Sequence, residues 1–119
     1  MIVGLGMDLV EVARIERAMQ NPRFVQKILT EAEREYCSSV ARVAGRWAAK
    51  EAVAKAVGLH LTWQQVEILP DELGQPRVIV RSSHFDPKRL RLTVTITHER
   101  THAASVAILE RVIVQASHI

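Results

Sequence analysis

Residues 40–57 read VARVAGRWAAKEAVAKAV, and this stretch decides the fold. It is rich in alanine, lacks proline and is followed by Gly58, which is typical of a long helix that ends at a glycine. On a helical wheel, Val40, Trp47 and Ala54 fall within one apolar stripe. We therefore expect the rest of the chain to be arranged around this helix.

The segment before the helix predicts one strand and three shorter helical pieces. Residues 2–10, IVGLGMDLV, are typical of a buried strand in which Gly4 and Gly6 let another backbone approach closely. The helical pieces are predicted at residues 11–20, at residues 24–29 and from Thr30 onward. Thr30 and Glu33 form a capping-box pattern, which marks a helix start.

After Gly58 the periodicity changes from helical to extended. Strands are predicted at residues 66–69, 77–81, 90–97 and 103–114, with a turn at residues 70–76 and a loop at residues 82–88. The predicted fold class is α+β, with helices packed on a mainly antiparallel sheet that the N-terminal strand completes.

Composition limits the possible functions. With 119 residues the chain is expected to form one domain, residues 1–119. The net charge of +3 favours an anionic ligand or an acidic partner without demanding nucleic acid, and 4% aromatic residues argue against the stacking platform of a single-strand nucleic-acid binder. Cys37 is the only cysteine, and no apolar run is long enough to cross a membrane. A cytoplasmic protein that binds neither nucleic acid nor membrane is therefore expected.

Two acidic residues occupy apolar settings. Glu51 falls in the middle of the apolar stripe, and Asp8 lies within the N-terminal strand in a context that buries both faces. Because a buried carboxylate needs a partner, the two acids predict a Mg²⁺ site where the helix packs on the strand, with Lys55 one turn beyond Glu51. The alternative is an ordinary Glu51–Lys55 pair and an Asp8 that caps a strand end.

Two groups of basic residues stand out. Arg42, Arg46 and Lys50 recur every four residues and predict a basic ridge beside the apolar stripe, suited either to a polyanionic ligand or to solvent. The second group covers the first helical pieces and comprises Arg14, Arg17, Arg23 and Lys27.

Residues 98–102 read HERTH and match the pattern of zinc peptidases. That chemistry needs His98 and His102 one turn apart on a helix, whereas the surrounding sequence is typical of a strand. Both histidines could then bind one zinc ion only if a tight turn brought them together. We therefore do not expect a peptidase.

Several ordered motifs resemble one family. The resemblance rests on residues 4–15 (GLGMDLVEVARI), 27–30 (KILT) and 44–56 (AGRWAAKEAVAKA), together with residues 74–76, 95–98 and 103–104. They are similar to holo-acyl-carrier-protein synthase, the small stand-alone type of 4'-phosphopantetheinyl transferase. The resemblance implies the fold of that family and transfer of 4'-phosphopantetheine from coenzyme A to a serine of apo acyl carrier protein, with release of adenosine 3',5'-bisphosphate.

The resemblance also implies roles for individual residues. Asp8 and Glu51 would bind Mg²⁺ and Lys55 would assist the leaving phosphate, so these three are the expected catalytic residues. The residues expected to bind coenzyme A are Arg46, Lys50, Lys55, Gly74, Pro76 and His98. The surface expected to dock the carrier protein consists of Arg14, Arg17, Arg23, Phe24 and Lys27. A homotrimer is implied, with the coenzyme A cleft between neighbouring subunits, and either a metal-bound water or a carboxylate would deprotonate the serine.

Two other functions compete with this interpretation. A Mg²⁺-dependent nuclease or phosphohydrolase would also use paired acids and a lysine, although its lysine typically follows the acid by two residues on a strand. A non-catalytic basic module that binds an acidic protein would need only the surface between Arg14 and Lys27.

Overall fold

The computed structural model describes residues 1–113. Its elements follow one another as β1 (Ile2–Glu11), α1 (Val12–Ala18), α2 (Pro22–Ile28), α3 (Glu31–Tyr36), α4 (Val40–Val57), the 3₁₀ helix η1 (Trp63–Gln65), β2 (Val66–Pro70), β3 (Pro76–Val80), β4 (Leu90–His98) and β5 (His102–Arg111). None of the described helices has both the length and the apolar character needed to cross a membrane.

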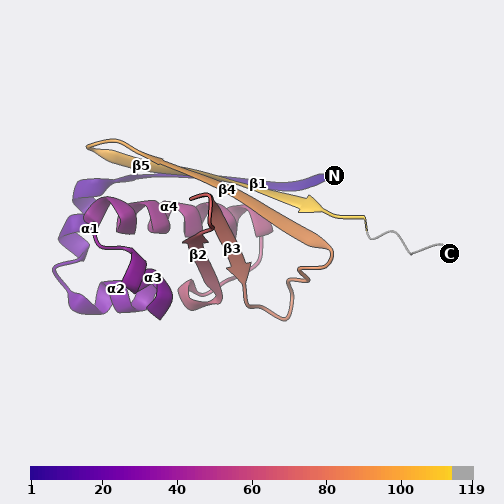
Figure 1. The fold of residues 1–119 in the computed structure, drawn as a ribbon, viewed down its shortest axis with the longest axis horizontal. Helices are drawn as coiled ribbons and strands as arrows, with labels where there is room; N and C mark the ends of the chain where they lie inside the picture. The colour runs from indigo at the N-terminus through magenta and orange to yellow at the C-terminus, as the bar shows by residue number, and fades with distance from the viewer. Residues whose placement is uncertain (114–119) are drawn as a thin grey trace.

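A three-stranded antiparallel sheet with the order β1-β5-β4 covers one side of α4 (Figure 1). The register places Asp8 of β1 opposite Ser105 of β5, and Ser105 opposite Ile96 of β4. Because β5 is central, β1 and β4 are the two edges of this sheet. Residues on β1 and on β4 that face α4 are therefore held on opposite sides of the helix.

The packing of α4 on β1 depends on two glycines. A Cβ atom added to Gly4 would overlap the carbonyl oxygen of Ala56, and one added to Gly6 would overlap that of Ala52. The close backbone approach expected from these glycines is confirmed, and α4 is the backbone that approaches. Since only glycine lacks a Cβ atom, the two residues set the separation between strand and helix.

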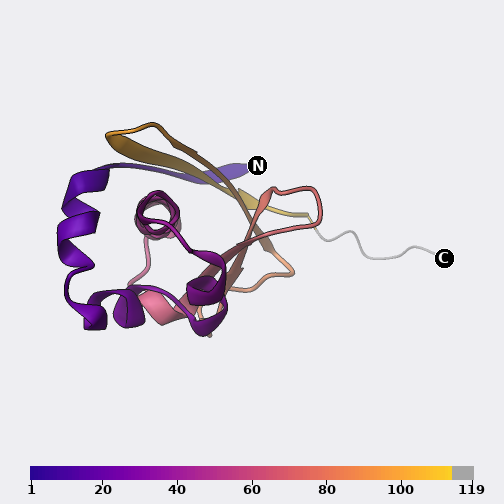
Figure 2. The same cartoon turned by 60° about the vertical axis from the view of Figure 1, so that its left-hand side comes forward.

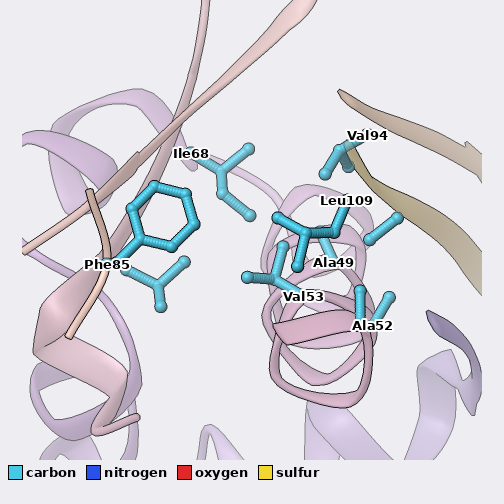
Figure 3. Close-up of a cluster of buried hydrophobic side chains, with 10 residues drawn as sticks. Ala49, Ala52, Val53, Ile68, Phe85, Val94 and Leu109 are labelled. Atoms are coloured by element: carbon cyan, nitrogen blue, oxygen red, sulfur yellow. The ribbon is translucent and has the colours of Figure 1, made fainter. Parts of the chain in front are cut away.

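Buried side chains surround α4 in two groups. In the first, Val53 of α4 lies between Ile68 and Phe85 on one side and Val94 and Leu109 of the sheet on the other (Figure 3). The second group joins α1 and α2 to the first half of α4. Its buried members are Val10, Ile15, Ile28, Leu29, Val43, Ala44, Ala48 and Ala103. Figure 2 looks nearly along α4 and shows the sheet above it and the short helices around its other sides.

Local sequence signals correspond to the observed boundaries. The predicted helix at residues 40–57 is confirmed, and Gly58 ends it in the left-handed conformation with φ of 73°. The capping box of Thr30 and Glu33 is present at the start of α3. The predicted hairpin is also present, because β2 and β3 pair from Val66 to Val80 around the predicted turn.

Three expectations about the sheet need correction. Among residues 1–113, β2 and β3 form a separate two-stranded sheet and do not join the other strands. The last strand ends at Arg111, and Val114 lies outside the described residues. The expectation that β1 is buried on both faces is wrong, since Leu5, Met7 and Leu9 are exposed on the face away from α4. As an edge strand, β1 is covered by α4 on one face only.

Candidate active site

Helix α4 carries two lines of polar residues on different sides. Residues four apart lie on the same side of a helix, so Glu51 and Lys55 continue the line of Trp47, while Arg42 and Arg46 form a second line. Five residues of α-helix, the step from Arg46 to Glu51, correspond to a rotation of about 140°. The two lines therefore approach different edges of the three-stranded sheet.

The first line reaches β1 through an ion pair. The Nζ atom of Lys55 lies 3.3 Å from Oδ1 of Asp8 and donates a hydrogen bond of 3.0 Å to the backbone oxygen of Met7. The side chain of Asp8 is 16% exposed and that of Lys55 54% exposed. Tertiary structure thus gives Lys55 a partner on β1, which helical spacing alone could not show.

Glu51 is less buried than its position in the apolar stripe predicts. It is half-buried and lines a small cleft of about 40 Å³ together with Ala54, Leu61 and Trp63. Among the described residues, every fully buried polar side-chain atom has a hydrogen-bond partner. The Glu51 carboxylate has no hydrogen-bond partner there, so its oxygens are not fully buried. The oxygens of Glu51 are therefore open to solvent and to a ligand, and the expectation that this residue faces the core is wrong.

The surroundings of Asp8 and Glu51 fit a Mg²⁺ ion. The backbones of Gly6 and Ala52 are in contact. Asp8 follows Gly6 by two residues, and Glu51 directly precedes Ala52. The two carboxylates therefore project from parts of β1 and α4 that touch each other. Residues 1–113 contain no cluster of three or more acidic, histidine or cysteine side chains able to hold a metal. Mg²⁺ commonly takes only one or two protein carboxylates and completes its shell with water and substrate phosphate. A two-carboxylate site suits this ion.

The second line borders a cavity of about 320 Å³. Four of the residues expected to bind coenzyme A line it, namely Arg46, Gly74, Pro76 and His98. Tyr36 and Arg42 also line it, whereas the predicted catalytic residues do not. A larger groove between β3 and β4 shares only Pro76 with the predicted site.

Lys50 does not lie where a phosphate could reach it. Its Nζ atom donates hydrogen bonds to Oε1 of Glu33 at 2.6 Å, to the backbone oxygen of Ile28 at 2.7 Å and to that of Trp63 at 2.9 Å. Both charged side chains are almost completely buried. An ammonium group has three protons, and all three are donated here. The expectation that Lys50 contacts coenzyme A is therefore corrected.

Burial lowers the pKa of Lys50 below its usual value, and the hydrogen bond and charge of Glu33 oppose that shift. The carboxylate of Glu33 also accepts hydrogen bonds from the backbone nitrogens of Thr30 and Ile68, both at 2.8 Å. This one pair joins α3, α4 and β2. Its structural role explains why a lysine is found at a buried position.

The predicted basic ridge is only partly present. Arg42 is exposed, but Arg46 and Lys50 are buried, and Nε of Arg46 donates a hydrogen bond of 2.8 Å to the backbone oxygen of Ile68. The hairpin and α3 pack over this side of α4, which the periodicity of the helix could not reveal. Of the three residues, Arg42 and Arg46 border the cavity.

The basic residues of α1 and α2 are exposed, as expected for a docking surface. Arg14, Arg17, Arg23 and Lys27 are absent from the ion pairs of the described residues. Phe24 of α2 begins an aromatic stack in which the ring of Trp47 contacts those of Phe24 and Trp63, with 5.7 Å and 4.6 Å between ring centroids. Trp63 also lines the cleft of Glu51, so this surface is continuous with that acid.

The HERTH segment forms the turn between β4 and β5. The backbone nitrogen of Glu99 donates a hydrogen bond to the backbone oxygen of His102, and His98 of β4 lies opposite Ala103 of β5 in the strand register. Since cross-strand partners share a face, His98 lies on the same face as buried Ala103, and His102 lies on the opposite face. A tight turn is present, yet the two histidines cannot bind one ion.

Sequence reasoning missed three residues at the site. Tyr36 borders the cavity, Trp63 borders the Glu51 cleft and Glu33 neutralises Lys50. The capping box signalled one hydrogen bond of Glu33 but not the long-range ones. No local pattern marks Tyr36 or Trp63, because their neighbours come from other parts of the chain.

Comparisons of the sequence and of the structure with known proteins give the same family. Residues 4–108 match the 4'-phosphopantetheinyl transferase superfamily. Holo-[acyl-carrier-protein] synthases of an Exiguobacterium species and of Chlorobaculum tepidum are 43% and 42% identical, over 92% and 89% of this chain and 93% and 97% of their own. The crystal structure of a holo-(acyl-carrier-protein) synthase from Bacillus anthracis in complex with CoA (3',5'-ADP) is similar, with a TM-score of 0.81 and 33% identity. It covers 94% of this chain and 99% of its own.

The buried Glu33–Lys50 pair predicts a large stability effect for one substitution. Lys50→Met should lower the free energy of unfolding by about 3–5 kcal/mol, because it leaves the Glu33 carboxylate buried without a countercharge. Urea unfolding followed by circular dichroism measures this loss. Lys88→Met, which removes an exposed lysine, is the control and should change stability by less than about 0.5 kcal/mol. Equal stability of the two variants would contradict the structural role of Lys50.

Proposed function

Since the chain belongs to the 4'-phosphopantetheinyl transferase superfamily, as one of its holo-acyl-carrier-protein synthases, we propose that Asp8, Glu51 and Lys55 form its catalytic centre. The enzyme transfers 4'-phosphopantetheine from coenzyme A to a serine of apo acyl carrier protein and releases adenosine 3',5'-bisphosphate. The observation that carries the proposal is the contact between β1 and α4, where Asp8 pairs with Lys55 and Glu51 directly precedes Ala52, the residue that approaches Gly6 of β1. Neither a nuclease nor a non-catalytic binding module is favoured by these relatives.

We propose that the two carboxylates hold Mg²⁺. The ion would offset negative charge on the coenzyme A pyrophosphate as its phosphoryl bond breaks. Asp8 and Glu51 supply the hard oxygen ligands that this ion prefers. Lys55, whose side chain is 54% exposed, forms an ion pair with Asp8 and would interact with the leaving phosphate. The serine proton would be taken up either by a carboxylate or by a water molecule at the site.

The cavity at the other side of α4 is proposed to receive the nucleotide end of coenzyme A. Arg46 and His98 bring cationic or hydrogen-bonding groups to it, and Gly74 and Pro76 shape its wall on the β2–β3 hairpin. Gly74 has φ of 83°, a conformation that favours glycine, so the turn that carries this wall requires this residue.

A transfer assay tests the catalytic centre. Asp8→Asn and Glu51→Gln should each lower kcat/KM by roughly 100-fold or more, because each removes a charged oxygen ligand of the Mg²⁺ that would offset negative charge in the transition state. The assay combines enzyme, Mg²⁺, coenzyme A and apo carrier protein, and mass spectrometry detects the phosphopantetheinyl adduct. Glu72→Gln removes an exposed carboxylate at the hairpin tip and should retain full activity. The proposed function fails if the natural chain forms no adduct, and the site assignment fails if either acid variant is fully active.

We propose that α1 and α2 dock the carrier protein. Arg14, Arg17, Arg23 and Lys27 are exposed on α1 and α2, and α2 also carries half-buried Phe24, a combination suited to an acidic helix with apolar side chains. The Cζ atom of Arg14 lies 5.5 Å from the ring centre of Trp47, which belongs to the Glu51 line of α4. A partner bound on this surface would present its serine near Glu51.

Charge reversal tests the docking surface. The double variant Arg17→Glu and Arg23→Glu should raise KM for apo carrier protein roughly tenfold, since several exposed charge contacts become repulsive. KM for coenzyme A should not change, because neither residue borders the cavity. Steady-state kinetics with each substrate varied in turn measures both constants. Lys88→Glu changes the charge elsewhere and should affect neither, and an equal rise in both constants for the double variant would refute the docking role.

We propose that the active site is completed between subunits of a homotrimer. In one chain, Asp8 lies on the edge strand β1 and His98 on the opposite edge strand β4, with β5 between them. The outer face of β1 exposes Leu5 at 65%, Met7 at 66% and Leu9 at 64%. Such an apolar row on an edge strand favours association with other copies. The family resemblance implies three subunits.

Light scattering tests the assembly. Leu5→Glu should reduce the mass from that of three chains to that of one, because it places a charge in the apolar interface. Its transfer activity should fall with the loss of the neighbouring half-site. Leu73→Glu places the same charge on an 85% exposed leucine at the hairpin tip and should remain a trimer. A Leu5→Glu protein that keeps the natural mass would exclude this face as the interface.

A further inference from the structure

We propose that Tyr36 is a positioning residue that holds Arg42 and Arg46 together as the binding site for the ribose 3'-phosphate of coenzyme A. The inference rests on the proposed function and names a determinant of substrate choice for it. Tyr36 would thereby set the preference for coenzyme A over 3'-dephospho-coenzyme A.

The tyrosine contacts both arginines. The Cζ atom of Arg42 lies 4.6 Å and that of Arg46 5.0 Å from the ring centre of Tyr36, both within the range of cation–π attraction. Arg42 also donates a hydrogen bond of 3.1 Å from Nη1 to the backbone oxygen of Tyr36. One residue at the end of α3 thus orients two guanidinium groups of α4.

The two arginines need such a support. They lie one helical turn apart, where like charges repel each other. Neither forms an ion pair with a carboxylate among residues 1–113, and no acidic residue lines their cavity. The negative face of the tyrosine ring reduces the repulsion without neutralising the charge. The cavity therefore keeps two positive charges for an anionic ligand.

The chemistry of coenzyme A identifies the anion. Coenzyme A carries a pyrophosphate and a ribose 3'-phosphate, and the bond that breaks is in the pyrophosphate. Asp8, Glu51 and Lys55 are proposed to act on that group, and none of them borders the cavity. The cavity is thus left for the 3'-phosphate, a monoester with close to two negative charges at neutral pH. Two guanidinium groups match this charge and can each form paired hydrogen bonds with phosphate oxygens.

Kinetics with two substrates test the role of Tyr36. In Tyr36→Leu, KM for coenzyme A should rise about tenfold, while kcat and KM for 3'-dephospho-coenzyme A stay near their natural values. Tyr36→Phe retains the ring and should restore the preference. Circular dichroism confirms that both variants are folded. A similar rise in KM for both substrates, or a Tyr36→Leu enzyme with unchanged preference, would overturn the proposal.

A binding measurement separates this proposal from the proposed function. Calorimetry compares adenosine 3',5'-bisphosphate with adenosine 5'-monophosphate, which lacks the 3'-phosphate, and needs no turnover. The natural protein should bind the bisphosphate more tightly, and Tyr36→Leu should reduce that difference about tenfold. If no pantetheinyl transfer occurs but this preference is observed, only the proposed function fails. Equal binding of both nucleotides by the natural protein would refute the phosphate site itself.

Discussion

The contact between the backbones of Gly6 in β1 and Ala52 in α4 is the constraint on which the rest of the structure depends. No side chain separates the strand from the helix at this point, so a shift of either element would create a collision or a cavity. Asp8 follows Gly6 by two residues on the same face of β1, and Glu51 precedes Ala52. The contact that closes the core therefore also sets the positions of the two residues that carry these carboxylates.

A second constraint is the buried pair of Glu33 and Lys50. Their hydrogen bonds extend to the backbone at Ile28, Trp63 and Ile68, and so connect three segments to the middle of α4. A buried ion pair needs every donor and acceptor to be satisfied, and that requirement allows few alternative arrangements. Since Lys50 is adjacent to Glu51, the same network fixes the part of α4 that carries this proposed catalytic acid. Stability and catalysis are thus linked through neighbouring residues with different tasks.

The helix divides the proposed reaction between its two sides. The acids and Lys55 face β1, whereas Arg42 and Arg46 border the cavity near the end of β4. In the proposed reaction, one coenzyme A molecule contacts both the acidic group with Lys55 and the two arginines. The apolar outer face of β1 is the proposed surface on which another subunit would bring these two groups together. In the proposed trimer, each subunit would supply its two halves of the site to different neighbours.

Local sequence determined most of the secondary structure. The alanine-rich run and Gly58 gave the limits of α4, the Thr30–Glu33 pattern gave the start of α3, and Gly4 and Gly6 indicated a close backbone approach, because these effects act within a few residues. The family motifs also singled out Asp8, Glu51 and Lys55. Only tertiary structure decided that Lys50 is buried, that Glu51 is open to ligand, that β2 and β3 stand apart and that Tyr36 holds two arginines. Burial and ion pairing depend on segments that are distant in sequence, and no periodicity within one helix can show which of its charged residues another segment will cover.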